Sequence, residues 1–295
     1  MVLEPPQMPS VEEQADWVEA SCLFGEDDSS VFREDLRTAL AESKQRIPKG
    51  KAPDRIVEDS LKEMSWREAT IPRLYPFRIY NDHVERIGDW QNASFYSFML
   101  LLSIKSFYQS RKAKLVTVKA HSKLFERLAT LSMKEHLARS IAFGFPRSGA
   151  IPRGLEKALV FFSHLSHETV AKRVDLRKCE KDAGVDVIAW YPIDNRSGQI
   201  VMLVQCTIEE KWINSGGKLS LGLWDDLINF VVTPIRALAF PYVCHTEWVY
   251  SSDQCGLLLD RLRIASTLSS ISPRHFMSTL IQSCSDQLPQ LRWFK

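Results

Sequence analysis

The chain has 295 residues, of which 45% are hydrophobic and 25% are charged. That length suits one large domain or two of ordinary size, and the composition is that of a globular protein with enough apolar material for a core. The formal net charge of +2 is too close to neutral to identify a nucleic-acid partner, so such a partner would require a local basic patch.

Six cysteines are scattered along the chain without a CxxC pair. This spacing fits neither a disulfide framework nor a zinc site. The N-terminal segment is acidic and contains prolines, unlike a secretory signal, and no apolar run reaches the roughly 20 residues needed to cross a bilayer. We therefore expect a cytoplasmic protein.

Helical periodicity dominates the first half of the chain. The spacing of apolar residues predicts helices over residues 10–22, 31–43, 54–69, 92–109 and 121–136. Ser10 and Glu13 have the spacing of a capping box at the start of the first helix. We expect residues 1–145 to form a helical region that contacts substrate, a protein partner or a second copy of the chain.

The pattern changes after a Gly- and Pro-containing segment at residues 144–152. The predicted elements are a helix at 153–167, strands at 170–176, 185–191 and 199–207, a helix near 223–230, a strand at 241–244, and helices at 252–268 and 273–287. Helices that alternate with a small central sheet predict an α/β (α+β) domain over residues 146–295.

Polar side chains stand at the ends of two of these strands. Asp186 opens one strand within the segment Gly184-Val185-Asp186, and Gln205 lies near the end of the next, in Gln205-Cys206-Thr207. Because side chains alternate along a strand, Gln205 and Thr207 share one face and Cys206 takes the other. Antiparallel pairing of the two strands would bring Asp186 and Gln205 together at one edge of the sheet.

This arrangement resembles the restriction-endonuclease-like nuclease superfamily, often written PD-(D/E)xK, over roughly residues 150–250. In that family a helix carries an acidic residue, one strand an Asp, and the next strand a Glu or Gln followed two residues later by Lys. The resemblance implies a small central mixed sheet flanked by helices. It also implies that Asp186 is the central metal ligand, Gln205 a second ligand and Glu156 the helix acid.

The function implied by the resemblance is metal-dependent endonucleolytic hydrolysis of nucleic acid, DNA in preference to RNA, with Mg²⁺ or Mn²⁺. Carboxylate and carbonyl oxygens hold such ions, which offset the negative charge that develops on the phosphate. Analogy at the level of the fold further suggests bacterial defence against foreign DNA. A double-strand cutter with one site per chain would need a homo-oligomer or two sequential nicks.

The chain departs from the family pattern at Thr207, which occupies the position of the lysine and cannot supply a positive charge. Lys211 is the first candidate to replace it, since a lysine stem is long and flexible, and Lys218 is the second. The predicted catalytic residues are thus Glu156, Asp186, Gln205 and Lys211. Asp186 could instead cap a turn, and Glu156 could be a solvated helix residue.

Three other functions stay open on the sequence. A catalytically degenerate nuclease fold would bind nucleic acid or scaffold a protein complex without cutting, and Thr207 favours it. An adaptor that acts through its helical half would have no affinity for nucleic acid. A thiol enzyme built on Cys206 fits poorly, because Cys206 is expected to point away from Asp186. The basic stretch from Lys105 to Lys123 could bind phosphates or be a solvated face.

Overall fold

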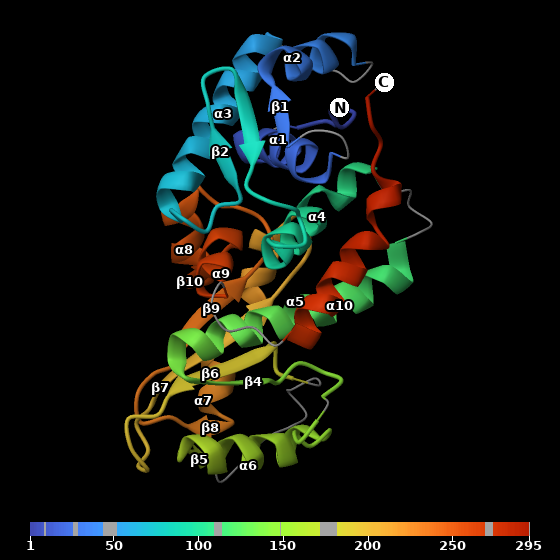
Figure 1. The fold of residues 1–295 in the computed structure, drawn as a ribbon. Coiled ribbons are helices and arrows are strands. Elements are labelled where there is room, and N and C mark those ends of the chain that lie inside the picture. Colours follow the sequence, from blue (N-terminus) through green and yellow to red (C-terminus); the bar gives the residue numbers. More distant parts are fainter. Residues whose placement is uncertain are drawn as a thin grey trace. The chain divides into compact units, whose positions relative to one another are not determined.

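The structure is a computed structural model that describes residues 1–8, 10–25, 29–43, 52–108, 114–147, 149–171, 182–268 and 274–294. The chain forms two compact units (Figure 1). Unit 1 consists of Met1–Val118, Pro241–His245 and Arg261–Lys295, and unit 2 of Lys119–Phe240 and Thr246–Asp260. Residues 119–145 therefore group with unit 2, although we expected the boundary near residue 145.

Unit 1 is built mainly from helices. They are α1 (Val11–Phe24), α2 (Arg33–Glu42), α3 (Pro53–Thr70), α4 (Ser94–Tyr108), α9 (Arg261–Thr267) and α10 (Arg274–Ser285), followed by a 3-10 turn, η4 (Leu288–Gln290). The predicted capping box is confirmed, since Ser10 Oγ accepts from Glu13 N and Glu13 Oε2 accepts from Ser10 N, each at 3.1 Å. An antiparallel sheet that the sequence did not predict has the order β1-β3-β2. Its strands are β1 (Ser30–Phe32), β2 (Phe77–Ile79) and β3 (His83–Arg86).

A buried ionic network joins the helices of unit 1. The guanidinium of Arg67 on α3 lies 2.7 Å from both Asp16 Oδ1 and Glu19 Oε1 of α1, and Arg261 at the start of α9 also pairs with Asp16. All four side chains are buried. Buried charges are tolerated only when they are paired and hydrogen-bonded, so these contacts fix α1, α3 and α9 to one another.

Unit 2 has the expected α/β composition. Its helices are α5 (Lys114–Leu137, from residue 119), α6 (Leu155–Ser166), α7 (Leu221–Asp225) and α8 (Trp248–Cys255), with a 3-10 helix, η3 (Trp212–Lys218). Its main strands are β4 (Arg139–Ala142), β6 (Val187–Tyr191), β7 (Ile200–Cys206), β9 (Ile235–Ala239) and β10 (Leu257–Leu259). Two further short strands, β5 (Thr169–Val170) and β8 (Ile228–Asn229), pair antiparallel with each other.

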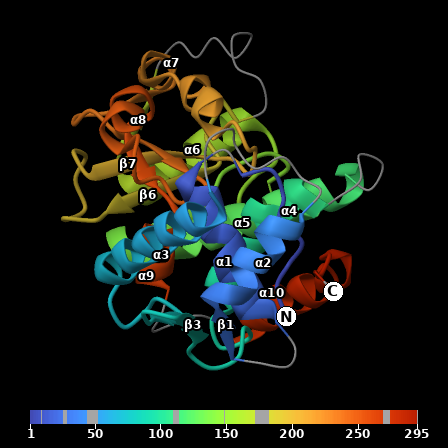
Figure 2. The same ribbon diagram turned by 90° about the horizontal axis from the view of Figure 1, so that it is seen from above.

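The five main strands form one mixed sheet of order β10-β9-β7-β6-β4. Strands β4, β6 and β7 run antiparallel in turn, whereas β7, β9 and β10 run parallel. Strands β6 and β7 lie side by side in both views (Figures 1 and 2). The predicted hairpin at residues 192–198 joins them. The near-continuous apolar run of β7 is explained by its place in the middle of the sheet.

One face of the sheet packs against α6. Ile188 of β6 and Leu203 of β7 belong to the same buried cluster as Leu159 and Phe162, which share one side of α6. The apolar spacing that predicted this helix is thus the spacing of the residues that it buries. Helix α5 runs across the sheet near β4 and β6 (Figure 1), and Ser140 Oγ of β4 donates to Thr130 O of α5 at 2.7 Å.

Several predicted elements near the end of the chain were wrong. The strand expected at 241–244 lies earlier, as β9, because Pro241 cannot continue a ladder of N–H donors. The helix expected over 252–268 is divided into α8, β10 and α9. Gly256, at a φ of +83°, ends α8, and a Cβ there would collide with Arg236 O of β9. The helix expected near 223–230 shortens to α7 and is followed by β8.

Three further predictions concern a strand after α6, the cysteines and membrane-spanning helices. The strand predicted at 170–176 is represented by β5, and residues 172–176 lie outside the described residues. The cysteines that the structure describes, all but Cys179, are free. No helix in the described part of the chain is long and apolar enough to cross a membrane.

Candidate functional site

Asp186 lies where β6 begins and β7 ends, and backbone groups hold it on several sides. Its N–H donates to Val204 O at 2.9 Å, and its Oδ2 accepts from Cys206 N at 2.7 Å, so these bonds flank Gln205. Its carbonyl accepts from the N–H groups of Phe143 and Gly144, at 2.7 and 2.9 Å. The carboxylate is thus fixed at the sheet edge that the sequence predicted.

A second carboxylate reaches the same place from helix α5. The Cβ that an L side chain would carry at residue 144 would lie 2.8 Å from Asp186 Oδ1 and 3.2 Å from Glu126 Oε2. The two carboxylate oxygens therefore face one point that is open only because residue 144 is glycine. Glu126 was not among the residues that the sequence singled out.

The pKa values of both acids reflect this crowding. Burial raises the pKa of Asp186 to about 7, the nearby charges of Glu126 and Asp182 act in the same direction, and the Cys206 N–H opposes them. Burial also raises the pKa of Glu126, while Lys123 lowers it. Two carboxylates that share a partly buried space resist simultaneous ionisation unless a cation joins them.

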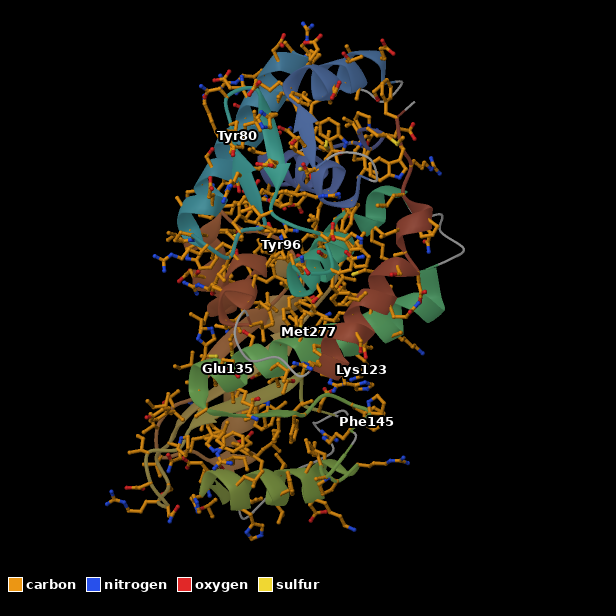
Figure 3. All side chains as sticks on the ribbon, viewed as in Figure 1. Tyr80, Tyr96, Lys123, Glu135, Phe145 and Met277 are labelled. Atoms are coloured by element: carbon orange, nitrogen blue, oxygen red, sulfur yellow. The ribbon has the colours of Figure 1, made fainter. Side chains whose placement is uncertain are left out.

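Lys123 is the cation that the structure places beside this pair. Lys123 lies on α5 (Figure 3), one turn before Glu126, and its Nζ is 2.6 Å from Glu126 Oε2. The side chain of Lys123 is 40% exposed, whereas that of Glu126 is 13% exposed. Lys123 is therefore the more exposed partner of this pair. In the sequence, Lys123 was noted only as the last residue of the basic stretch that begins at Lys105.

The loop before Asp186 is ordered by Asp182. Its carboxylate accepts from Phe145 N at 3.0 Å and from Gly184 N at 3.1 Å. Gly184 has a φ of +77°, and a Cβ there would lie 2.8 Å from Lys218 O. The glycine of the Gly184-Val185-Asp186 motif is thus required by the backbone, since only glycine combines this conformation with so close an approach.

Gln205 is 6% exposed, and its Oε1 has no hydrogen-bond partner among the described residues. A buried amide oxygen without a partner costs free energy, which is a common sign of a missing ligand or water. Strand alternation puts Gln205 on the face of Leu203 and Cys206 on the opposite face. The structure thus brings Gln205 beside Asp186 along the backbone and gives no hydrogen bond between these two side chains.

Two predicted site residues lie elsewhere. Glu156 is exposed in the first turn of α6, and Lys211 is exposed at the start of η3. In contrast, Glu126 raises the pKa of Asp186 and Lys123 lowers it. The acidic helix residue next to Asp186 is Glu126 of α5. Glu156 is instead a solvent-exposed helix residue, which is the alternative that the sequence left open.

The surroundings of Thr207 and Cys206 indicate structural roles for both side chains. Thr207 Oγ1 accepts from Glu209 N at 3.2 Å and lies 3.3 Å from Ser215 Oγ, so the threonine ties down the loop after β7. Burial and the charge of Asp186 raise the pKa of Cys206 well above its ordinary value. Cys206 is therefore close to Asp186, contrary to our expectation, but its environment disfavours the thiolate that a nucleophile needs.

The donor set suits a hard divalent cation with incomplete protein coordination. Within the described residues, no group of three or more His, Cys, Asp or Glu side chains could hold a metal ion. Mg²⁺ needs no such cage, because proteins commonly bind it through one or two carboxylates together with water and substrate phosphates. The cradle at Gly144, faced by Asp186 and Glu126, fits that mode.

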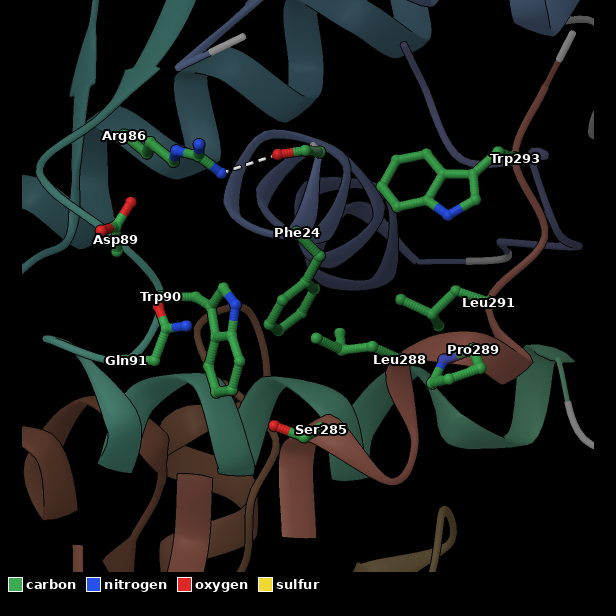
Figure 4. Close-up of a pocket in the computed structure, with 11 residues that line it drawn as sticks. Phe24, Arg86, Asp89, Trp90, Gln91, Ser285, Leu288, Pro289, Leu291 and Trp293 are labelled. Carbon is green, nitrogen blue, oxygen red and sulfur yellow. Dashed lines mark hydrogen bonds between the residues drawn. The ribbon is translucent and has the colours of Figure 1, made fainter. Parts of the chain in front are cut away.

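Unit 1 contains a separate pocket of about 640 Å³ (Figure 4). Aromatic and apolar side chains dominate its lining, which comprises Phe24, Gly25, Arg86, Asp89, Trp90, Gln91, Ser285, Leu288, Pro289, Leu291 and Trp293. Its guanidinium, Arg86, donates to Leu23 O and Gly25 O. With Asp89 as its one carboxylate, this pocket lacks the paired acids found in unit 2.

Comparison of the chain with family models, curated proteins and solved structures yields no match.

Proposed function

We propose that the protein is a metal-dependent nuclease that hydrolyses phosphodiester bonds of nucleic acid, DNA in preference to RNA. The observation that carries the proposal is the convergence of Asp186 and Glu126 on the open point at Gly144. The resemblance to restriction-endonuclease-like enzymes supports it, with Glu126 in place of Glu156 as the helix acid. The mixed sheet of unit 2, with Asp186 at the start of β6, is compatible with that fold.

Asp186 and Glu126 are the residues that would hold Mg²⁺ or Mn²⁺. When bound, such an ion neutralises charge on the phosphate and lowers the pKa of a bound water. Asp186 contributes a carboxylate whose orientation is set by the Cys206 N–H. Glu126 contributes a second oxygen at the cradle, and its remaining acceptor sites can orient a water by hydrogen bonding. Gln205, a predicted ligand, lies on the face of Leu203, opposite Cys206, so its buried Oε1 is directed away from this cradle.

The test is cleavage of plasmid, linear duplex and single-stranded DNA, and of RNA, with Mg²⁺ or Mn²⁺. Loss of an ion that is worth several kcal/mol to the transition state predicts that Asp186→Asn and Glu126→Gln each lower the rate by on the order of 10³-fold. Glu135→Gln is the matched control, because Glu135 is an exposed acid near the far end of α5 (Figure 3). Equal rates for Glu126→Gln and Glu135→Gln would refute the proposal.

A second candidate function is nucleic-acid binding without cleavage. Thr207 favours it, because the family's lysine position is occupied by a residue with a structural role in the loop after β7. This alternative predicts that the wild type binds nucleic acid, that added Mg²⁺ or Mn²⁺ produces no cleavage, and that Asp186→Asn binds as the wild type does.

A further inference from the structure

We propose that Lys123 of helix α5 provides the positive charge that Thr207 cannot, by contacting a phosphate of the nucleic acid held at the Asp186–Glu126 cradle. This inference rests on the proposed function and extends it to a residue outside the family's sequence motif. Lys123 would be a direct ligand of the substrate phosphate, whereas Asp186 and Glu126 would hold the metal ion.

The geometry places the ammonium group beside the cradle. Lys123 Nζ lies 2.6 Å from Glu126 Oε2, and that oxygen faces the same point as Asp186 Oδ1. The positive charge of Lys123 also acts to lower the pKa values of Asp186 and Cys206. Because its side chain is 40% exposed and that of Glu126 is 13% exposed, a phosphate arriving from solvent would meet Lys123 first.

The other candidate lysines are less well placed. Lys211 is exposed at the start of η3, and Lys218 Nζ lies 3.5 Å from Ser215 Oγ in the loop that Thr207 ties down. Lys123, in contrast, lowers the pKa of Asp186. Of the described lysines, Lys123 is the one that the structure pairs with a carboxylate of the cradle.

Charge balance gives an independent reason for a lysine here. Asp186, Glu126 and a phosphodiester together carry three negative charges, and one divalent ion offsets two of them. The ammonium of Lys123 offsets the third. Asp182 adds a further negative charge near both carboxylates, which strengthens the need for a cation beside the ion. Charged donors positioned at the phosphate are most effective when water is partly excluded.

The simpler explanation is that Lys123 and Glu126 form an ordinary ion pair on a helix surface, spaced three residues apart. Such pairs add little to the free energy of unfolding and have no effect on substrate binding. The two explanations differ in what removal of the lysine does. A surface pair predicts no change in metal or nucleic-acid affinity. A phosphate ligand predicts weaker nucleic-acid binding together with unchanged or tighter metal binding, since one repelling cation is lost.

The experiment compares the full-length wild type with Lys123→Met, Lys123→Arg and the control Lys134→Met, an exposed lysine on the same helix. Mn²⁺ affinity is measured by calorimetry, duplex DNA affinity in Ca²⁺ over a range of salt concentrations, and cleavage in Mg²⁺. We expect Lys123→Met to bind Mn²⁺ at least as tightly as the wild type. Its salt slope for DNA should fall by about 1, and its cleavage rate by roughly 100-fold or more.

Lys123→Arg retains the charge and should keep the wild-type salt slope. A Lys123→Met variant with the slope and rate of Lys134→Met would overturn the inference while leaving the proposed function intact. If the wild type binds neither Mn²⁺ nor nucleic acid, the proposed function fails and the inference fails with it. If the wild type binds Mn²⁺ and DNA without cutting, the salt slope of Lys123→Met for DNA still distinguishes a phosphate ligand from a surface ion pair.

Discussion

At the scale of single residues, Asp186 links the ionisation of the site to stability. Its partly buried carboxyl has a pKa raised to about 7, compared with an ordinary value of 3.8. The folded state therefore binds more protons than the unfolded state between about pH 4 and 7. The stability from this group is complete below pH 4 and is lost as the pH rises through 7.

We therefore expect metal-free wild type to lose stability from pH 4 to 8 relative to Asp186→Asn. The difference should be a few kcal/mol at most, because solvent reaches the carboxyl and screens it. The asparagine oxygen can still accept from the Cys206 N–H, so the comparison isolates the charge. Urea unfolding in the presence of a chelator measures it. The same stability difference at pH 4 and pH 8 would show that Asp186 titrates normally.

Gly144 provides a second prediction at the residue scale. A Cβ there would lie 2.8 Å from Asp186 Oδ1 and 3.2 Å from the Cα of Asp186, so Gly144→Ala must push the carboxylates apart. We expect a destabilisation of about 1–3 kcal/mol and a loss of Mn²⁺ affinity. Gly222→Ala in α7 is the control, because the nearest atom to its Cβ would be 3.9 Å away. Wild-type Mn²⁺ affinity in Gly144→Ala would contradict a metal site at this cradle.

At the scale of elements, the sequence predicted local structure and missed long-range pairing. The β6–β7 hairpin could be predicted because its apolar runs and its turn are adjacent in the chain. The parallel pairing of β7 with β9 could not, since it depends on a distant segment, β9, that lies within a longer apolar stretch. The short strands β1, β2 and β3 carry too few residues for a periodic signal.

The same distinction explains which parts of the candidate site were found. Asp186 and Gln205 stand at the ends of predicted neighbouring strands, so local pattern placed them together. Glu126 comes from a helix that precedes the predicted domain, and its position depends on how α5 crosses the sheet. Glu156 also lies on an amphipathic helix, in the first turn of α6, and tertiary packing decides which of the two acids approaches Asp186. One available signal was the Lys123–Glu126 pair beside the buried Phe125.

At the scale of the whole molecule, each of the two units has its own stabilising centre. Unit 1 contains the buried ionic network, and unit 2 contains the apolar cluster between the sheet and α6. Removing one member of a buried ion pair leaves its partner charged and unpaired, which costs about 3–5 kcal/mol. We therefore expect Arg67→Met to destabilise the protein by that amount in thermal or urea unfolding.

The control for Arg67→Met is Arg37→Met in α2. Arg37 pairs with Glu34 at the surface, where both side chains are about half exposed or more. Its removal should leave the unfolding free energy nearly unchanged, because solvent replaces the lost contact. Similar effects for the two substitutions would mean that the buried network contributes no more than a surface pair.

Calorimetric titration with Mn²⁺ measures whether Asp186 and Glu126 form a divalent metal site. We expect the wild type to bind Mn²⁺, Asp186→Asn and Glu126→Gln each to abolish binding, and Glu156→Gln to bind as the wild type does. Binding that survives Glu126→Gln and is lost in Glu156→Gln would contradict a metal site at the Asp186–Glu126 cradle. It would show that the acidic helix residue of the site is Glu156 of α6.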